Sequence, residues 1–444
     1  MNDEPAFPGP LPLECSQTQG AGRVENLAMA QRWPEVAFNA EQVRAWLASL
    51  PALAAQVGGA PQDWQIGGPD TGDASPAWQV RDPDTGQGVR VTQAQPLQRG
   101  WFEQQHQRIA GPHLAGLIPA QLHYDANLHL SVTELFTPQA ALRRELVAGR
   151  SYAQVPVAVA EYIARSAVLT SALALPLETV LEHTAVFSHA PTRLAIEQIF
   201  ADPFEDLSRN RWTTPELDDT ANNVRQDADI RAAVASAGEK FLSRKEALLH
   251  GDLHTGSVRV AGSDTRVVDA ASAQYGPVGF DVGVFIAHLL IAFFAQSGQH
   301  TEADPRQDHA QIILKQINQF WSHFALRHDT LWQQNAQGDA WPRRLFIQPA
   351  HVAAFARARQ LRLQNIYEDA LAFAGAEIIR RILGHAHSLD FEAISNPERR
   401  ADAERRALAL ARNLLLAPHR LSYIEAVTQR AQQLAVRTMV EFAN

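Results

Sequence analysis

A histidine-glycine-aspartate loop, followed by a second aspartate downstream, is the most chemically specific pattern in this sequence. The stretch LLHGDLHTGSVRV, Leu248–Val260, brings a strand-like run to His250 and Asp252 before a second short strand. A carboxylate in such a loop can accept the proton of a hydroxyl group that attacks a γ-phosphate, and His250 would brace the loop backbone. Further along, RVVD ends at Asp269, which can hold a Mg²⁺ ion that bridges nucleotide phosphates. The order of the two motifs predicts phosphoryl transfer, with Asp252 as the catalytic base and Asp269 as the metal ligand.

Two other interpretations of the first motif remain open. His250, Asp252 and His254 alternate, so on an extended strand they would share one face and could bind a transition metal. Alternatively, Asp252 merely caps a turn. The intervening Gly251 and the Thr-Gly-Ser that follows favour a loop over a strand. The second motif, which ends at Asp269, favours phosphoryl transfer over both alternatives.

The composition is that of a packed globular protein without a basic surface. The chain has 444 residues, of which 46% are hydrophobic and 20% charged, and its net charge is -9. This acidic balance argues against nucleic acid as a partner. The single cysteine, Cys15, allows no intrachain disulfide, and the N-terminus is acidic where a secretory signal would be basic. The longest apolar run, from Gly283, contains His288 and is too short to span a bilayer. We therefore expect a cytoplasmic protein without a membrane partner.

The elements that position these motifs divide the chain into a strand-rich part and a helical part. Residues 1–35, rich in Pro, Gly and Gln, predict a flexible tail. Turn signals such as PDTG and DPDTG separate short strand-like runs between Gly67 and Leu97, and LHLSVTELF predicts a further strand. Helices are predicted for FNAEQVRAWLASL, capped by Asn39, and for a long C-terminal segment that begins at Asn396.

Together these signals predict an α+β, two-lobed, protein-kinase-like fold. Residues 36–136 form a small β-rich N-lobe on the nucleotide side. Residues 137–444 form a large, mainly α-helical C-lobe that carries the catalytic loop and the substrate pocket. The strand-like runs VRV and RVVD are exceptions inside the helical lobe, and they carry the two aspartates.

Several motifs resemble those of a known family. HGDLHTGS followed by YGPVGFD resembles the 5-methylthioribose kinases, which are relatives of the aminoglycoside and choline kinases. The stretch from Asp369 to Arg405, which contains AGAEIIRR, is similar to the same family, and TELF at residues 133–136 resembles its hinge. HGDLH alone indicates only the kinase superfamily, whereas YGPVGFD and AGAEIIRR select the thioribose branch. The resemblance is strong over roughly residues 245–415 and excludes the first 35.

The resemblance implies an ATP- and Mg²⁺-dependent sugar kinase of methionine salvage, which phosphorylates an anomeric hydroxyl and forms a homodimer. It implies that Arg380 and Arg381 approach the sugar and the transferring phosphate beside Asp252, and that Glu134 and Phe136 of the hinge contact the nucleotide. Guanidinium groups suit phosphate because each can place two donors on its oxygens. The alternative for the arginines is an ordinary pair on a helix surface. Successive helical residues point about a quarter-turn apart, so it stays open whether both face the site.

All departures from the family motifs concern residues that would bind the nucleotide or its metal ion. Where the family has a motif resembling VKQALP, this chain has VTQAQP, so Thr92 replaces the lysine that contacts the α- and β-phosphates. No lysine precedes Lys240. Arg90 lies two residues before Thr92, on the same face of a strand, and could reach the phosphates or pair with Glu103. The other interpretation of Arg90 is a solvent-exposed strand residue.

The glycine-rich loop and the metal motif depart as well. GGPDTGDASPAW places Asp70 and Asp73 where backbone donors would face phosphate, and the family motif resembling DPE is here Asp269-Ala270-Ala271. One carboxylate and the nucleotide phosphates can still hold Mg²⁺, although more weakly. Two hypotheses follow: a sugar kinase with a weakened nucleotide site, or a pseudokinase that acts by binding a ligand or a protein.

Overall fold

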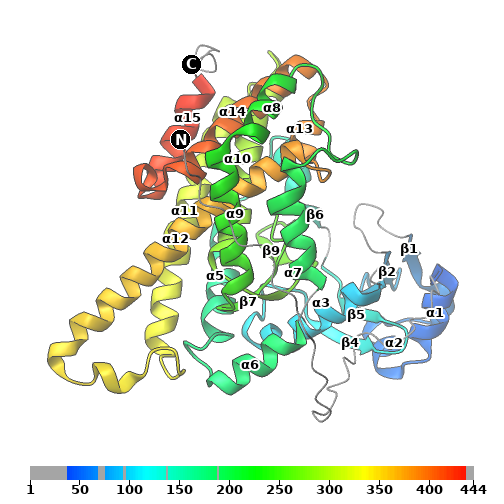
Figure 1. The fold of residues 1–444 in the computed structure, drawn as a ribbon. Helices are drawn as coiled ribbons and strands as arrows, with labels where there is room; N and C mark the ends of the chain where they lie inside the picture. Colours follow the sequence, from blue (N-terminus) through cyan, green and yellow to red (C-terminus); the bar gives the residue numbers. More distant parts are fainter. Residues whose placement is uncertain (1–37, 69–75, 94–96, 137–138, 188–189, 437–444) are drawn as a thin grey trace, which may run out of the picture. The chain divides into compact units, whose positions relative to one another are not determined.

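The computed structural model describes residues 38–436, with gaps at 69–75, 94–96, 137–138 and 188–189. The predicted tail, residues 1–35, lies outside the described residues, and so do Asp70 and Asp73. The described chain has an α+β fold, in which a small antiparallel sheet precedes a large helical part (Figure 1). The predicted two-lobed, kinase-like fold is therefore confirmed. The lobe boundary at residue 136 stays a prediction, because the next two residues are not described.

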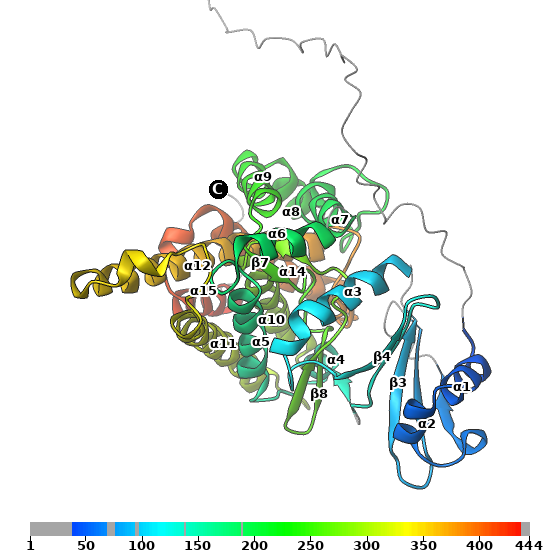
Figure 2. The same cartoon turned by 90° about the horizontal axis from the view of Figure 1, so that it is seen from below.

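The N-terminal sheet has five antiparallel strands in the order β1-β2-β3-β5-β4. They are β1 Gln65–Gly67, β2 Ala77–Arg81, β3 Gly88–Gln93, β4 Gln121–Asp125 and β5 Leu130–Glu134. Helices α1 (Ala40–Ala48) and α2 (Pro51–Val57) pack on one face (Figure 2). Alternate apolar residues of β3 and β5, such as Val91 and Val132, are buried there. The residues between them, including Arg90 and Thr92, point to the opposite face, toward α3 (Leu97–Ala110).

The helical part is built around one almost entirely buried helix, α10 (Gly279–Gln299). By length and composition α10 alone among the described helices could cross a membrane, so the expectation that this apolar run is too short to span a bilayer is wrong. Its apolar window is completely buried, as in a core helix. It packs against α11 (Gln307–Gln334), α12 (Val352–Leu383) and α14 (Pro397–Leu416). Gly283 permits the close approach to α12, because a Cβ there would lie 2.4 Å from the Ala370 carbonyl oxygen.

Shorter helices complete this part of the chain. They are α4 Leu142–Val147, α5 Val155–Leu169, α6 Leu177–Val186, α7 Ala190–Ala195, α8 Asp218–Gln226, α9 Ala228–Ser243, α13 Leu389–Glu392 and α15 Ile424–Val436. Two small antiparallel sheets carry the chemical motifs: β7 (Ala247–Leu249) pairs with β10 (Gln274–Gly276), and β8 (Val258–Ala261) pairs with β6 (Ala140–Ala141) and β9 (Asp264–Val267).

The predicted helix starts are confirmed in detail. The side chain of Asn39 accepts a hydrogen bond from the Gln42 amide at the start of α1, and Asn396 accepts one from the Arg399 amide at the start of α14. Both asparagines satisfy backbone donors that the first helical turn leaves without a partner.

Candidate active site

The loop between β7 and β8 is held in place by a buried aspartate at the start of α10. The backbone N–H groups of His250 and Gly251 donate to the Asp281 carboxylate at 2.7 and 3.1 Å. Gly251 has a φ of 82°, and a Cβ there would lie 2.0 Å from the Ser272 carbonyl oxygen. Only glycine fits this position, which explains the glycine of the HGD motif.

His250 braces the loop, as predicted. Its Nε2–H donates to the Val268 carbonyl at 2.9 Å, and its Nδ1 accepts from the Asp252 amide at 3.3 Å. Both ring nitrogens are thus engaged by backbone, and His254 lies in the same loop with its Nδ1 accepting from the Ser257 amide at 3.0 Å. Within the described part of the chain, no group of three His, Cys, Asp or Glu side chains is placed to bind a metal ion. The transition-metal interpretation is therefore wrong.

Asp252 faces the two arginines that the sequence singled out. Its Oδ1 lies 3.3 Å from Arg381 Nη2 and 3.9 Å from Arg380 Nη1. Both arginine residues are buried, with exposed fractions of 8% for Arg380 and 6% for Arg381, so they are not an ordinary pair on a helix surface. Burial disfavours the carboxylate form of Asp252, but His254, Arg381 and Arg380 outweigh burial and hold its pKa well below the usual range. Burial lowers the pKa of His254, and the Asp252 carboxylate opposes that shift.

A buried glutamate explains why both arginines face the same way. Glu377 precedes them on α12 by three and four residues, and its Oε2 accepts from Arg380 at 3.0 Å while its Oε1 accepts from Arg381 Nε at 2.6 Å. His288 of α10 donates from Nε2 to the same Oε1 at 3.1 Å. The sequence had suggested no role at the site for Glu377 or His288. The spacing E-x-x-R-R and a lone histidine inside an apolar run were the available signals.

Asp269 follows β9 in a left-handed backbone conformation, with a φ of 68°. Such a conformation is uncommon for a residue with a side chain and is concentrated at functional sites. Asp269 pairs with Arg99 of α3 at 3.5 Å. The next residues form a turn, closed by a bond from the Ala273 amide to the Ala270 carbonyl at 3.1 Å. Ala271 is buried in this turn and does not share the face of an extended strand with Asp269.

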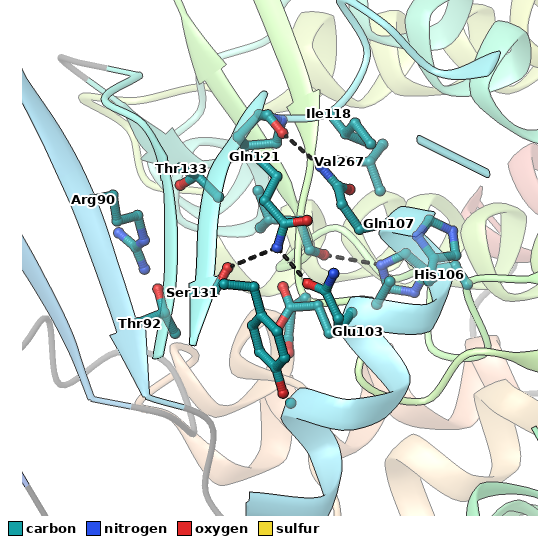
Figure 3. Close-up of a pocket in the computed structure, with 18 of the residues that line it drawn as sticks. Arg90, Thr92, Glu103, His106, Gln107, Ile118, Gln121, Ser131, Thr133 and Val267 are labelled. Atoms are coloured by element: carbon teal, nitrogen blue, oxygen red, sulfur yellow. Dashed lines mark hydrogen bonds between the residues drawn. The ribbon is translucent and has the colours of Figure 1, made fainter. Parts of the chain in front are cut away.

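A pocket lies between the sheet, α3 and the residues that follow β9. Figure 3 shows Arg90 and Thr92 on β3, Ser131 and Thr133 on β5, and Glu103 on α3 around it. Asp269 and His250 also line this pocket. Arg90 is therefore half-buried beside the pocket and is not a freely exposed strand arginine.

The half-buried glutamate of this pocket, Glu103, interacts electrostatically with Arg90, as the sequence suggested. Burial and the charge of Asp269 together raise the pKa of Glu103 to about 7, although Arg90 and Arg99 oppose the shift. Two arginines and two carboxylates are thus close enough to influence one another at the place where a lysine–glutamate pair is expected from the family motif.

The hinge residues Glu134 and Phe136 lie elsewhere. Both contact Arg266 of β9: Glu134 Oε1 is 3.6 Å from Arg266 Nε, and the Arg266 guanidinium lies 5.1 Å above the Phe136 ring. The structure thus brings Arg90 and Asp269 to one pocket, and it brings Arg380 and Arg381 to Asp252. His250 connects the two groups, because it lines the pocket and holds the Asp252 loop to Val268.

The donor set fits a weakly held magnesium ion. Mg²⁺ is usually bound by one or two carboxylates together with substrate phosphates and water. Asp269 supplies one such carboxylate at the edge of the pocket, on a backbone conformation that fixes its direction.

Comparisons with known proteins agree with this arrangement. The profile of the Phosphotransferase enzyme family matches residues 39–312. A methylthioribose kinase of Escherichia coli O45:K1 is 32% identical over 405 residues, which is 87% of this chain and 95% of that protein. Methylthioribose kinase 1 of Oryza sativa subsp. japonica is 31% identical and covers 84% of this chain and 89% of its own length.

A solved structure with lower sequence identity also aligns with most of this chain. A choline/ethanolamine kinase family protein from Mesorhizobium loti aligns with a TM-score of 0.42 and 15% identity, over 88% of this chain and 99% of that one. The profile and the two relatives together span both the pocket and the arginine pair, and they show that this chain belongs to the methylthioribose kinases of the phosphotransferase enzyme family.

Proposed function

We propose that this protein is an ATP-dependent kinase that phosphorylates the anomeric hydroxyl of S-methyl-5-thioribose, a step of methionine salvage. One observation carries the proposal: a single carboxylate, Asp252, lies within 4 Å of two buried guanidinium groups, at 3.3 and 3.9 Å. This arrangement suits a hydroxyl group that loses its proton while its oxygen approaches a phosphoryl group. The relatives named above are methylthioribose kinases, which supports the choice of sugar.

In the proposed reaction, the sugar oxygen forms a bond to the γ-phosphorus of ATP and the bond to the bridging oxygen of ADP breaks. Asp252 orients the hydroxyl and receives its proton, while Arg380 and Arg381 neutralise charge on the transferring oxygens. A carboxylate with a lowered pKa is a weak base, so the proton moves late, as a loose phosphoryl-transfer transition state allows. Asp269 would hold the Mg²⁺ ion, which supplies charge neutralisation on the nucleotide phosphates when it is bound.

We place the donor nucleotide beside β3 and α3. Arg90 lines this pocket and takes the part of the missing lysine, with Glu103 as its partner. Glu134 and Phe136 are proposed to contact the nucleotide from the hinge. Arg266, which both residues contact, would set their position.

The resemblance also leads us to propose a cytoplasmic homodimer with an N-lobe of residues 36–136 and a C-lobe of residues 137–444. The alternative of a catalytically silent binding module is not favoured, because the chain matches methylthioribose kinases over most of its length. The arginine pair around Asp252 is intact as well.

The test is direct. Purified protein is incubated with ATP, Mg²⁺ and methylthioribose, and sugar phosphate is followed by ³¹P NMR. We expect a new anomeric phosphate signal that requires all three components. Thermal melting with each ligand is measured beside it, since a ligand at a hundred times its dissociation constant stabilises a protein by about 2.7 kcal/mol. Stabilisation by the sugar or by ATP without product would contradict the kinase proposal and support the binding-module alternative.

A further inference from the structure

The two arginines beside Asp252 are neighbours in sequence, yet both guanidinium groups lie on the same side of α12. Adjacent helical side chains point about 100° apart, and two guanidinium groups repel each other, so this arrangement needs a cause. The Glu377 carboxylate provides one, because it lies a turn earlier on the helix and accepts from both arginines. Glu377 is 0% exposed, so its attraction to the arginines is not weakened by solvent.

Glu377 is in turn held by a neutral histidine. His288 donates from Nε2 to Glu377, and its Nδ1 accepts from Arg143 Nη2 at 3.3 Å, so the hydrogen bond from Arg143 fixes which ring nitrogen carries the proton. Burial, and then the charge of Arg381, lower the pKa of His288 to about 3, so it adds no further positive charge to the cluster at neutral pH.

These contacts form one continuous chain of hydrogen bonds and ion pairs. It runs from Arg143 of α4 through His288 of α10 to Glu377 and Arg381 of α12, and it ends at Asp252 in the loop after β7. Each link has one defined direction of donation. The chain therefore ties three helices to the loop that carries the reaction.

We propose that Glu377 and His288 are positioning residues for the phosphoryl transfer. In this proposal, which rests on the function proposed above, His288 holds Glu377, and Glu377 holds both guanidinium groups against Asp252 and the transferring phosphate. A misplacement of about 1 Å in such a constellation can cost about 10²-fold in rate. Buried polar networks of this kind function only when every member keeps its partner.

The matched variants are His288→Leu and His288→Gln. Leucine fills the space of the ring but cannot bond Glu377 or Arg143. Glutamine can accept from Arg143 through its carbonyl and donate to Glu377 through its amide. We expect the leucine variant to lose kcat by about 10–100-fold with a nucleotide KM within about twofold of the wild type. The glutamine variant is expected to recover most of that loss.

His328→Leu is the control for removing a buried histidine. His328 is also 0% exposed, and both of its ring nitrogens lack a hydrogen-bond partner among the described residues. It lies on α11 between Phe324 and Trp332, away from the arginine pair. We expect this variant to keep its turnover. If His288→Leu does not fold, His288→Asn takes its place, because the shorter amide cannot reach both partners.

A spectroscopic measurement separates this proposal from the proposed function. With ¹⁵N-labelled arginine, the Nε–H signal of Arg381 is assigned by its loss in Arg381→Lys. We expect the signal to be protected from solvent exchange in the wild type and in His288→Gln, and to shift and exchange faster in His288→Leu. This readout needs no turnover, so it decides the proposal even if methylthioribose is not the substrate. An unchanged Nε–H signal, or an unchanged kcat in an active leucine variant, would overturn it.

Discussion

Replacing Asp252 by asparagine removes the proposed base while keeping its size. We expect kcat to fall by about 10²–10⁴-fold, the usual contribution of a general base, which is about 2.7–5.5 kcal/mol of barrier. The asparagine oxygen can still accept from Arg381, now 3.3 Å from Asp252 Oδ1, so the loop should keep its geometry. The nucleotide KM should stay within about threefold, because the pocket beside β3 and α3 does not include Asp252.

The same substitution should have the opposite effect on anion binding. A phosphate bound to Arg380 and Arg381 would lie roughly 4 Å from the Asp252 carboxylate, and two unit charges at that distance repel by about 1 kcal/mol in water. Removing the carboxylate charge should therefore strengthen the binding of inorganic phosphate by about fivefold. Titration calorimetry measures this affinity, and a coupled assay of ADP release measures kcat.

The combination of a lower kcat and a tighter phosphate site distinguishes the proposed role from general damage. Thermal melting and nucleotide affinity of Asp252→Asn serve as the folding controls. A variant that retains turnover within tenfold of the wild type would refute the assignment of Asp252 as the base. Weaker phosphate binding in a folded variant would refute the electrostatic reasoning about the arginine pair.

Three further predictions concern the nucleotide site and stability. Arg90→Ala should weaken nucleotide binding by about 1–3 kcal/mol, the scale of a hydrogen bond to a charged group, and should leave sugar affinity unchanged. If calorimetry gives the variant the same nucleotide affinity as the wild type, Arg90 does not replace the missing lysine. Ala271→Glu places a carboxylate in a buried turn that does not share a face with Asp269, so it should lower the melting temperature and give no magnesium-dependent gain in nucleotide affinity. A gain in Mg²⁺ that disappears in EDTA would contradict this account. Burial raises the pKa of Glu404 from 4.5 to about 7, although Thr213 opposes the shift. Its stabilising protonated form is therefore complete below about pH 4.5 and lost as the pH rises through 7. The free energy of unfolding of Glu404→Gln should exceed that of the wild type by up to about 3 kcal/mol at pH 8 and should equal it at pH 4. Urea unfolding measures both values, and a difference that is the same at the two pH values would contradict this account.

The parts of this protein that sequence alone predicted are those governed by local rules. The loop at Asp252 contains Gly251, and its left-handed backbone conformation favours glycine. Asn396 caps α14 and is followed by a proline at the first helical position. The alternation of Val89, Arg90 and Val91 placed Arg90 on the face opposite the buried valines. Such signals depend on neighbours within a few residues.

The missed features depend on packing between distant segments. Arg99 forms an ion pair with Asp269 because α3 packs near the end of β9. Arg266 of β9 contacts Glu134 and Phe136, which are also distant in the sequence. Glu377 was a different case, since its spacing from the arginine pair was visible in the sequence. Its effect was not predicted because a carboxylate that bridges two guanidinium groups requires burial, and the C-terminal half of α12 is buried by packing against α10 and α14.

The contacts of Asp281 have a consequence for motion in this protein. The amides of the His250–Gly251 loop bond to a residue in the first turn of α10, and α10 lies at the centre of the core. Loops that open on their own make few such contacts, and their amides exchange with solvent without global unfolding. Here the two amides can exchange only when Asp281 separates from them, which leaves a buried carboxylate without these two hydrogen-bond donors. The reaction loop therefore belongs to the same cooperative unfolding unit as the core helix, and any opening that admits substrate has to come from the elements around it.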